Sequence, residues 1–484
     1  MNALLNFSSL TTWLLIFTVA AYFSVLITTL TVIIMENRQP VKTIAWILVL
    51  TSIPVGGLVF FYFFGQNIRR ERLIGRKARQ LLSQKRKHPG SRSAKAAIAT
   101  EYQRLASLVE RTNGSHTFAG NSTELFTRGE DFFSSLIRSI AEAKHHVHLQ
   151  TYIIDHDSVG EAVSEALMAK AREGVEVRLL YDDVGCWHTP NDFFARMKAA
   201  GVRVSSFMPV RFPSLTHKIN YRNHRKIAVI DAHTGYIGGM NIALRYTTAA
   251  DGRTWLDTHL RISGSAVAGL QHHFLTDWYL ATGILINDSR FYQPLHTPTA
   301  SGTGAVQIVT SSPASQWPDI MYGLTQAFHN ARRHIYIQTP YFMPTEPVMQ
   351  ALQTAAMSGI DVRIMLPEKP DGFWLRYAND AYYSDALSAG IKLYTYTAGF
   401  LHSKSIVIDD GFATIGSTNM DYRSFENNFE ANAFIYDPAF ATHLRDNFLA
   451  TIPHCTPVSP SQWKSRSKLH KVQESLTRLL SPLF

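Results

Sequence analysis

Two short stretches of this sequence carry the same chemically active residues in the same order. The first is His224-Arg-Lys226-Ile-Ala-Val-Ile-Asp231, and the second is His402-Ser-Lys404-Ser-Ile-Val-Ile-Asp409. Residues two apart on a β-strand point to the same side, so each histidine should lie beside its lysine. An imidazole can attack phosphorus or transfer a proton, and an ammonium group can hold phosphate oxygens. The pattern therefore indicates chemistry on a phosphodiester.

Each stretch is followed by a small-residue segment that ends in an asparagine. These segments are Gly238-Gly239-Met-Asn241 and Gly416-Ser417-Thr-Asn419, and in both copies the asparagine lies seventeen residues after the histidine. Glycine lets a neighbouring strand approach closely, whereas Asn and Ser supply neutral hydrogen-bond donors. We expect both lysines to hold the non-bridging oxygens, with both asparagines beside them. No Asp, Glu or His cluster has a metal-ligand spacing, so neither a metal nor another cofactor is expected.

The two motifs lie inside a wider internal duplication with a period near 180 residues. The segments 146–151, 174–178 and 200–204 of the first copy resemble 334–339, 359–363 and 389–393 of the second. A single motif of three fixed residues recurs by chance, but two copies with matched glycines and asparagines do not. Because the period far exceeds that of solenoid repeats, each copy is expected to be a domain.

Within each copy, short β-branched runs alternate with helical stretches. Residues 146–154 and 175–181 read as strands, and the segment 160–172 reads as the helix between them. This order predicts an α/β fold with a mixed, largely parallel sheet covered by helices. We expect two similar lobes, 121–298 and 299–455, that pack with a pseudo-twofold relation.

The N-terminal region has the composition of a membrane anchor. No charged residue occurs in 1–35, and apolar runs at about 11–35 and 43–65 each reach the ~20 residues that a spanning helix needs. The short polar turn between them predicts a transmembrane helical hairpin over residues 1–65. The connector that follows, 66–120, has eleven Lys or Arg between Arg69 and Lys95 against the single Glu71. The positive-inside rule then places the lobes in the cytoplasm.

The charge of the chain indicates an anionic partner. Forty-seven Lys and Arg against thirty-seven Asp and Glu give a formal net charge of +10, which suits nucleic acid or an anionic membrane surface equally well. The last segment, 456–484, combines Lys464, Arg466, Lys468 and Lys471 with an apolar end. It is expected either to pack on the protein as an ordinary amphipathic element or to contact the membrane.

The paired H-x-K-x(4)-D motifs with their following G-[GS]-x-N resemble those of the phospholipase D superfamily, over about residues 123–449. This resemblance implies that one histidine forms a phosphohistidine and the other acts as general acid and then general base. His224 is our preferred nucleophile. The resemblance also implies that an acidic residue downstream of each motif orients an imidazole, and Asp257 and Glu430 match those places. Asp231 and Asp409 are expected to be structural and to pair with backbone groups or neighbouring side chains.

The whole arrangement of two N-terminal spans, basic connector and two catalytic lobes resembles the bacterial cardiolipin synthases of the two-span type. That resemblance implies an enzyme of the bacterial inner membrane that transfers a phosphatidyl group between two phosphatidylglycerol molecules and releases glycerol. Anionic phospholipids are then the expected partners, and nucleic acid is not. The same resemblance, which includes a similar Ser-Pro-Leu ending, favours membrane contact for the C-terminal segment. A membrane-bound phospholipase D hydrolase would carry the same catalytic residues, and a nucleic-acid phosphodiesterase could use the same pocket. The sequence does not predict an oligomeric state.

Overall fold

The computed structural model describes residues 2–35, 40–53, 55–65, 98–210, 220–247, 254–292, 302 and 304–481. The chain divides into an N-terminal unit, Met1–Ile68 with Val210–Asn220, and a larger unit, Arg69–Pro209 with Tyr221–Phe484. Most of the basic connector, 66–97, and the expected lobe boundary at 298 and 299 lie outside the described residues. The larger unit carries both motifs, and we call it the catalytic unit.

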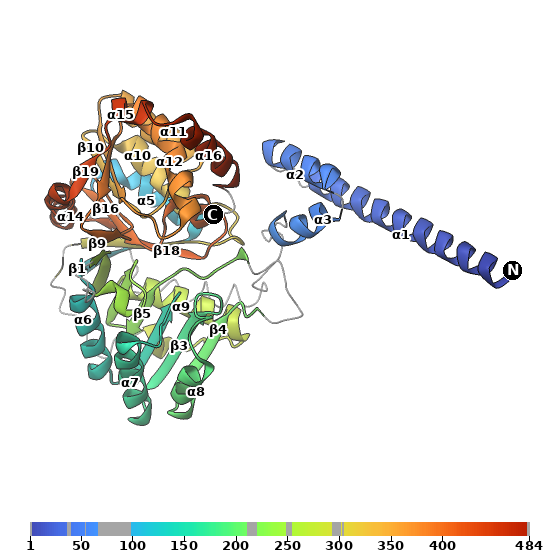
Figure 1. The fold of residues 1–484 in the computed structure, drawn as a ribbon. Helices are drawn as coiled ribbons and strands as arrows, with labels where there is room; N and C mark the ends of the chain where they lie inside the picture. Colours follow the sequence, from blue (N-terminus) through green and yellow to red (C-terminus); the bar gives the residue numbers. More distant parts are fainter. Residues whose placement is uncertain are drawn as a thin grey trace. The chain divides into compact units, whose positions relative to one another are not determined.

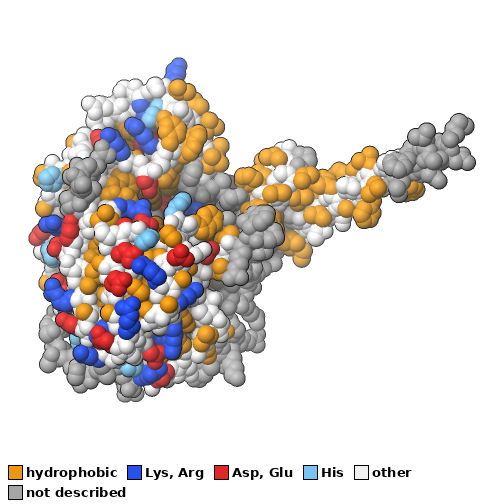
Figure 2. Space-filling model, turned by 60° about the horizontal axis from the view of Figure 1, so that its bottom comes forward, with side chains coloured by type: hydrophobic (Ala, Val, Ile, Leu, Met, Phe, Trp, Pro, Cys, Tyr) orange, Lys and Arg blue, Asp and Glu red, His pale blue; other side chains and the backbone are white. Residues whose placement is uncertain are grey.

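The N-terminal unit contains one helix that is long and apolar enough to cross a membrane among the residues described. This span is Thr11–Met35 of α1 (Asn2–Met35), and Figure 2 shows hydrophobic side chains along the N-terminal helices. The second expected span, 43–65, is not confirmed. Its residues form α2 (Pro40–Ser52), α3 (Gly56–Phe60) and the π-helical turn η1 (Phe61–Gly65) instead of one continuous helix. Leu26 and Ile33 of α1 nevertheless pack with Leu50 and Phe61, so these pieces fold back against α1.

One 15-stranded sheet runs through the catalytic unit, as far as the structure describes it (Figure 1). Its order is β4-β3-β2-β5-β6-β8-β1 for the first copy, followed by β9-β18-β16-β15-β10-β12-β13-β19 for the second. The first-copy strands are β1 (Thr117–Phe126), β2 (His146–Thr151), β3 (Glu176–Asp182), β4 (Arg203–Phe207), β5 (Ile227–Ile230), β6 (Thr234–Gly238) and β8 (His259–Ser263). The second-copy strands are β9 (Gly304–Ser311), β10 (His334–Gln338), β12 (Asp361–Pro367), β13 (Lys392–Tyr396), β15 (Ser405–Ile408), β16 (Phe412–Gly416), β18 (Glu430–Tyr436) and β19 (Cys455–Pro457).

The strand order of the first copy repeats in reverse across the β1–β9 pair, which is the pseudo-twofold relation that the duplication predicts. Strands β2 and β10, and likewise β3 and β12, hold equivalent places. The sheet is mixed, as expected, but the prediction that it is largely parallel is wrong. Parallel pairing is confined to β2–β3–β4 and β10–β12–β13, and the remaining pairs of this sheet are antiparallel. Short hairpins after each motif add antiparallel strands that the strand–helix–strand pattern does not reveal.

Helices cover both copies at equivalent places. They are α6 (Gly129–Glu142), α7 (Ser158–Arg172), α8 (Asn191–Ala199) and α9 (Val267–Thr282) in the first copy, and α10 (Asp319–Asn330), α11 (Glu346–Met357), α12 (Phe373–Ser388) and α14 (Pro438–Thr451) in the second. The predicted strands at 146 and 175 and the helix at 160 are confirmed to within a few residues. A shared core contains Val229 and Leu260 from the first copy with Ile308 and Val407 from the second, so the copies form one body.

Candidate active site

The two motifs lie where the two copies pair with each other. His224 follows an isolated bridge between Asn223 and Phe429, and its amide donates to the Phe429 carbonyl at 2.9 Å. His402 follows β14 (Gly399–Leu401), which pairs in parallel with β7 (Thr254–Leu256), and its amide donates to the Leu256 carbonyl at 2.8 Å. Each histidine is therefore held against the segment that leads into the acidic residue of the other copy.

Each imidazole is bonded to a buried carboxylate from the opposite copy. His224 Nδ1 lies 3.1 Å from Glu430 Oε1, and His402 Nδ1 lies 2.6 Å from Asp257 Oδ2. Both carboxylates are fully buried, and both histidines are nearly so. A carboxylate that accepts the Nδ1–H leaves Nε2 with its lone pair, which is the form that can attack phosphorus or take a proton.

The motif lysines and asparagines are buried beside the imidazoles. Lys226 Nζ donates to the His224 carbonyl at 2.6 Å, and Lys404 Nζ donates to the His402 carbonyl at 2.5 Å. Asn241 Nδ2 donates to the Tyr246 hydroxyl, whereas the side-chain oxygen of Asn419 has no hydrogen-bond partner within the described ranges. The ammonium groups lie near the buried Asp257 and Glu430 carboxylates, which favour their charged form, and charged lysines suit the non-bridging oxygens of a phosphodiester.

The glycines and the serine after the motifs differ in what they do. A side chain at Gly238 would overlap the backbone of Thr258 and His259, and one at Gly416 would overlap the carbonyl of Ala431. Close strand approach thus explains both glycines, as the sequence predicts. A Cβ at Gly239 would overlap the Asp257 carboxylate, while the equivalent Ser417 donates its hydroxyl to Glu430. The two carboxylates therefore have different surroundings.

The motif aspartates end their strands and shape the following hairpins. Asp231 and Asp409 both adopt a φ of 52°, a left-handed conformation, at the start of the three-residue turns that join β5 to β6 and β15 to β16. The Asp231 carboxylate accepts the amides of Lys144, His145 and His146. Asp409 accepts the three amides that lead into β10. Both carboxylates thus bond backbone amides of the segment that leads into a neighbouring strand.

Burial dominates the electrostatics of the site. Burial, and to a smaller extent the positive charge of Lys226, lowers the pKa of His224 to about 4. Burial, together with the charges of Lys404 and Lys226, lowers the pKa of His402 well below its ordinary value. Burial also lowers the pKa of Lys404 to about 8. Charges of one copy change pKa values in the other, since Lys226 and His224 of the first copy both lower the pKa of His402 in the second. A bound phosphate anion would reverse these shifts by favouring the protonated forms.

The two carboxylates shift in opposite directions. Burial raises the pKa of Asp257 to about 7, although Lys404 and the Thr258 amide oppose it. Burial alone would also raise the pKa of Glu430, but His224, Lys226 and the Ser417 hydroxyl hold it below its usual value. Glu430 further accepts the Asn428 amide at 3.2 Å. Glu430, the partner of His224, is therefore better stabilised as an anion than Asp257, the partner of His402.

Three aromatic residues beside the imidazoles were not predicted from the sequence. The Tyr152 ring lies 5.1 Å from His224, and its centroid lies 5.3 Å from Lys226 Nζ. Tyr246 and Trp255 lie 5.6 Å and 5.5 Å from His402. Tyr152 directly follows the duplicated Gln-Thr pair, which is the one sequence signal that could have identified it.

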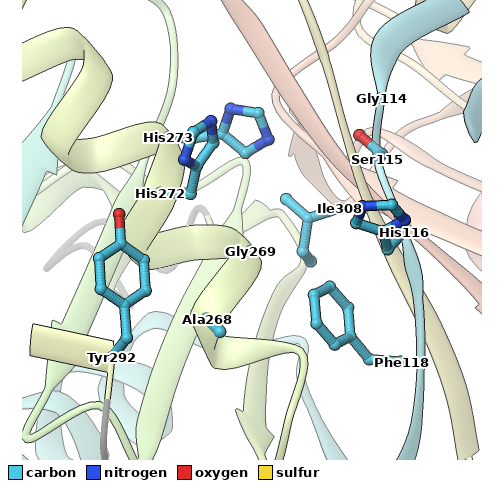
Figure 3. A pocket seen from close by; sticks show the side chains of 10 residues that line it. All are labelled: Gly114, Ser115, His116, Phe118, Ala268, Gly269, His272, His273, Tyr292 and Ile308. Carbon is cyan, nitrogen blue, oxygen red and sulfur yellow. The ribbon is translucent and has the colours of Figure 1, made fainter. Parts of the chain in front are cut away.

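Two other features lie apart from the motifs. The cavity in Figure 3 is lined by residues such as His116, Phe118 and Ile308, and no motif residue lines it. Asp380, His470 and Glu474 come close enough to hold a metal ion, a grouping that sequence spacing did not predict. Arg466 already donates hydrogen bonds to both carboxylate oxygens of Glu474. We therefore interpret this group as an ion-pair network between α12 and the C-terminal helix (Lys468–Leu480).

Two histidine–lysine motifs joined across a duplicated mixed sheet define the phospholipase D-like class of proteins. The family described as "Cardiolipin synthase, PLD-like domain" matches residues 136–278 and 324–452, and "Phospholipase_D-nuclease N-terminal" matches residues 16–66. A phosphatidylserine synthase structure from Haemophilus influenzae shares the fold, with a TM-score of 0.60 and 14% identity over 79% of this chain and all of that one.

Curated relatives narrow the class to one family. The chain is 39% identical to a cardiolipin synthase of Alkalihalophilus pseudofirmus, with 93% of this chain and 91% of that one covered. It is 40% identical to one of Geobacillus kaustophilus over the same shares, and 38% identical to the major cardiolipin synthase of Bacillus subtilis, with 93% and 95% covered. The chain belongs to the cardiolipin synthase family, whose members are phosphatidyltransferases, and with its apolar helix α1 it is a membrane protein.

We expect Arg225→Ala to destabilise the catalytic unit by about 3–5 kcal/mol. The Arg225 guanidinium pairs with the buried Asp277 at 2.7 Å and donates to the carbonyls of Glu430 and Ser311 in the second copy. Its removal leaves a buried carboxylate without its counter-ion. Thermal unfolding in detergent, followed by tryptophan fluorescence, measures the loss. The control Arg261→Ala breaks an exposed pair with Glu124 and should cost less than about 1 kcal/mol; equal losses would refute the argument.

The catalytic unit should lose stability as the pH falls from about 6.5 to about 4. Burial lowers the pKa of His146 to about 4 and that of His259 to about 3. In this range the unfolded chain binds protons that the folded chain does not, so acid favours unfolding, while above the ordinary value both states are neutral. His259 stacks on Phe132 at 3.9 Å, so His259→Phe should keep this packing and lose less stability between pH 6.5 and 4. An unchanged pH dependence would count against this assignment.

Proposed function

We propose that this protein makes cardiolipin from two phosphatidylglycerol molecules through a phosphohistidine intermediate. The observation that carries the proposal is the pair of imidazoles, each with Nδ1 bonded to a buried carboxylate of the other copy and each beside a buried lysine. One imidazole can act as nucleophile while the second handles protons. Family membership supplies the substrate class, because the similar proteins are named cardiolipin synthases.

In the first half-reaction, His224 Nε2 attacks the phosphorus of phosphatidylglycerol. The bond from phosphorus to the glycerol oxygen breaks, and His402 donates a proton to that oxygen as glycerol leaves. Lys226 and Lys404 offset the charge on the non-bridging oxygens, with Asn241 and Asn419 beside them. His224 is preferred as the nucleophile because Glu430, with its lowered pKa, can stabilise the cationic ring of a phosphohistidine.

In the second half-reaction, the terminal hydroxyl of another phosphatidylglycerol attacks the phosphohistidine. His402, now neutral, takes the hydroxyl proton, the bond between phosphorus and His224 breaks, and cardiolipin leaves. One phosphodiester is exchanged for another, so the scheme needs no nucleotide. Asp257 orients His402 through Nδ1 in both halves.

We further propose that residues 1–65 anchor the protein in the bacterial inner membrane with two spans. The packing of Leu50 and Phe61 against α1 supports a hairpin, and the family match over 16–66 treats both apolar runs as one segment. The basic residues that follow favour a cytoplasmic catalytic unit.

The test incubates the detergent-solubilised protein with phosphatidylglycerol alone and identifies the products by mass spectrometry. Cardiolipin and glycerol in equal amounts are expected. Phosphatidic acid without cardiolipin would make the protein a hydrolase and overturn the proposal. Absence of turnover from phosphatidylglycerol would overturn it as well.

A further inference from the structure

The C-terminal helix α16 (Lys468–Leu480) contacts the rest of the catalytic unit through its polar side. Glu474 and Thr477 are buried, and His470 Nε2 lies 3.1 Å from Asp380 Oδ2 of α12. Arg478 of α16 pairs with Asp385 of α12 at 2.7 Å. Ion pairs and hydrogen bonds, rather than apolar side chains, thus hold α16 on α12.

The apolar side of α16 faces outward. It comprises Leu469, Val472, Leu476, Leu479 and Leu480. Their spacing of three and four residues makes one stripe, and Leu469 and Leu479 are 69% and 77% exposed. A helix on a water-soluble surface normally buries such a stripe, because removing leucine side chains from water is favourable. The inverted orientation therefore indicates that something other than water covers the stripe.

The surroundings of the stripe favour a lipid surface. Lys468 and Lys471 are exposed along the neighbouring side of α16, where they would meet anionic headgroups. Phe373 and Trp374, at the start of α12, are 67% and 58% exposed. They adjoin α16, since the Phe373 ring lies 5.4 Å from Tyr377, which in turn lies 5.0 Å from His470. Figure 2 shows hydrophobic side chains on the upper part of the catalytic unit, where Figure 1 places α12 and α16.

The aromatic pair lies at the motif edge of the sheet. Strand β12 runs parallel to β10, and α12 begins just after β12 ends. Gln338, at the end of β10, pairs with Ser405, directly after Lys404. The Tyr341 hydroxyl donates to Asp371 at 2.7 Å, which ties the loop before Phe373 to the end of β10. A surface that bound Phe373 and Trp374 would therefore also lie against the edge of the sheet that carries the second motif.

We propose that the stripe of α16, together with Phe373 and Trp374, inserts into the surface of an anionic bilayer and presents the motif edge to membrane lipids. The inference deepens the proposed function and rests on it for the choice of a phospholipid partner. The first copy has no counterpart of α16 among the described elements, and α8 is shorter than α12, so the contact belongs to the second copy.

The test measures where single residues of α16 lie relative to the bilayer. The full chain carries His224→Ala, so that no turnover occurs, and Cys455→Ser, which leaves the buried Cys186. A nitroxide is attached through Leu476→Cys or Leu479→Cys in phosphatidylglycerol vesicles, with Ser475→Cys and Lys471→Cys, which are exposed polar positions outside the stripe, as matched controls. We expect oxygen, relative to a water-soluble nickel chelate, to relax labels at 476 and 479 several-fold more strongly than labels at 475.

Three results would overturn the proposal. Labels at 476 and 479 could respond to nickel as strongly as those at 475, which places the stripe in water. Dipolar broadening between labels would identify a second copy of the chain as the occupant. An unchanged ratio in purely zwitterionic phosphatidylcholine vesicles would remove the role of anionic lipid. None of these readouts depends on activity, so failure of the proposed function would be recognised separately.

Discussion

His224→Ala and His402→Ala should each lower cardiolipin formation by at least about a thousandfold. The first removes the nucleophile and the second removes the group that protonates glycerol and later deprotonates the acceptor. Mass spectrometry of products from phosphatidylglycerol measures both losses. Membrane insertion should be unchanged, because neither residue belongs to the N-terminal unit. His233→Ala, in the hairpin after the first motif, is the matched control and should retain activity.

A nitrophenyl phosphodiester separates the two roles, because nitrophenolate leaves without needing a proton. With this substrate His402→Ala should release a burst of one nitrophenolate per site and then stall as the phosphohistidine. His224→Ala should release none. A burst from His224→Ala and none from His402→Ala would exchange the two assignments. Normal cardiolipin formation by either variant would exclude the two-histidine mechanism.

Glu430→Gln and Asp257→Asn should each lower the rate by about a hundredfold to ten-thousandfold. An amide can donate to Nδ1 and so favour the wrong imidazole tautomer while preserving the shape of the site. Because the pairs cross between the copies, Asp257→Asn should behave as His402→Ala does and give a burst that stalls. Glu430→Gln should behave as His224→Ala does and weaken the burst itself.

The control for this pair of variants is Asp231→Asn, whose carboxylate bonds backbone amides rather than an imidazole. It should lower thermal stability while keeping a normal ratio of burst to turnover. If Asp257→Asn weakened the burst and Glu430→Gln stalled after it, each carboxylate would serve the histidine of its own copy. That outcome would contradict the crossed geometry.

Much of the site is predictable from the sequence because it depends on local rules. The spacing of two residues sets His224 beside Lys226 on one side of an extended segment. Asp231 and Asp409 mark tight turns because that residue type tolerates the left-handed conformation. The duplication predicts equivalent strands at His146 and His334, and the structure has them. These features need only a few neighbouring residues, or comparison of one copy with the other.

The crossing of the acid–histidine pairs could not be predicted, because it depends on the parallel pairing of β7 with β14 and on the bridge between Asn223 and Phe429. The opposite pKa shifts of Asp257 and Glu430 have the same origin, since burial and partners are set by packing between copies. The antiparallel majority of the sheet likewise arises from strand pairings between distant segments, which periodicity does not reveal.

The C-terminal segment shows the same division. Its sequence predicts an amphipathic helix with basic residues and leaves two partners possible, the protein or the membrane. Only the tertiary structure assigns its sides, because the ion pairs of Glu474, His470 and Arg478 with their partners hold the polar side against the protein and leave the leucines outward. Sequence alone thus specified the reactive groups and their repeats, since these depend on residue type and local spacing. Which groups meet, and which faces remain open, was decided by long-range packing.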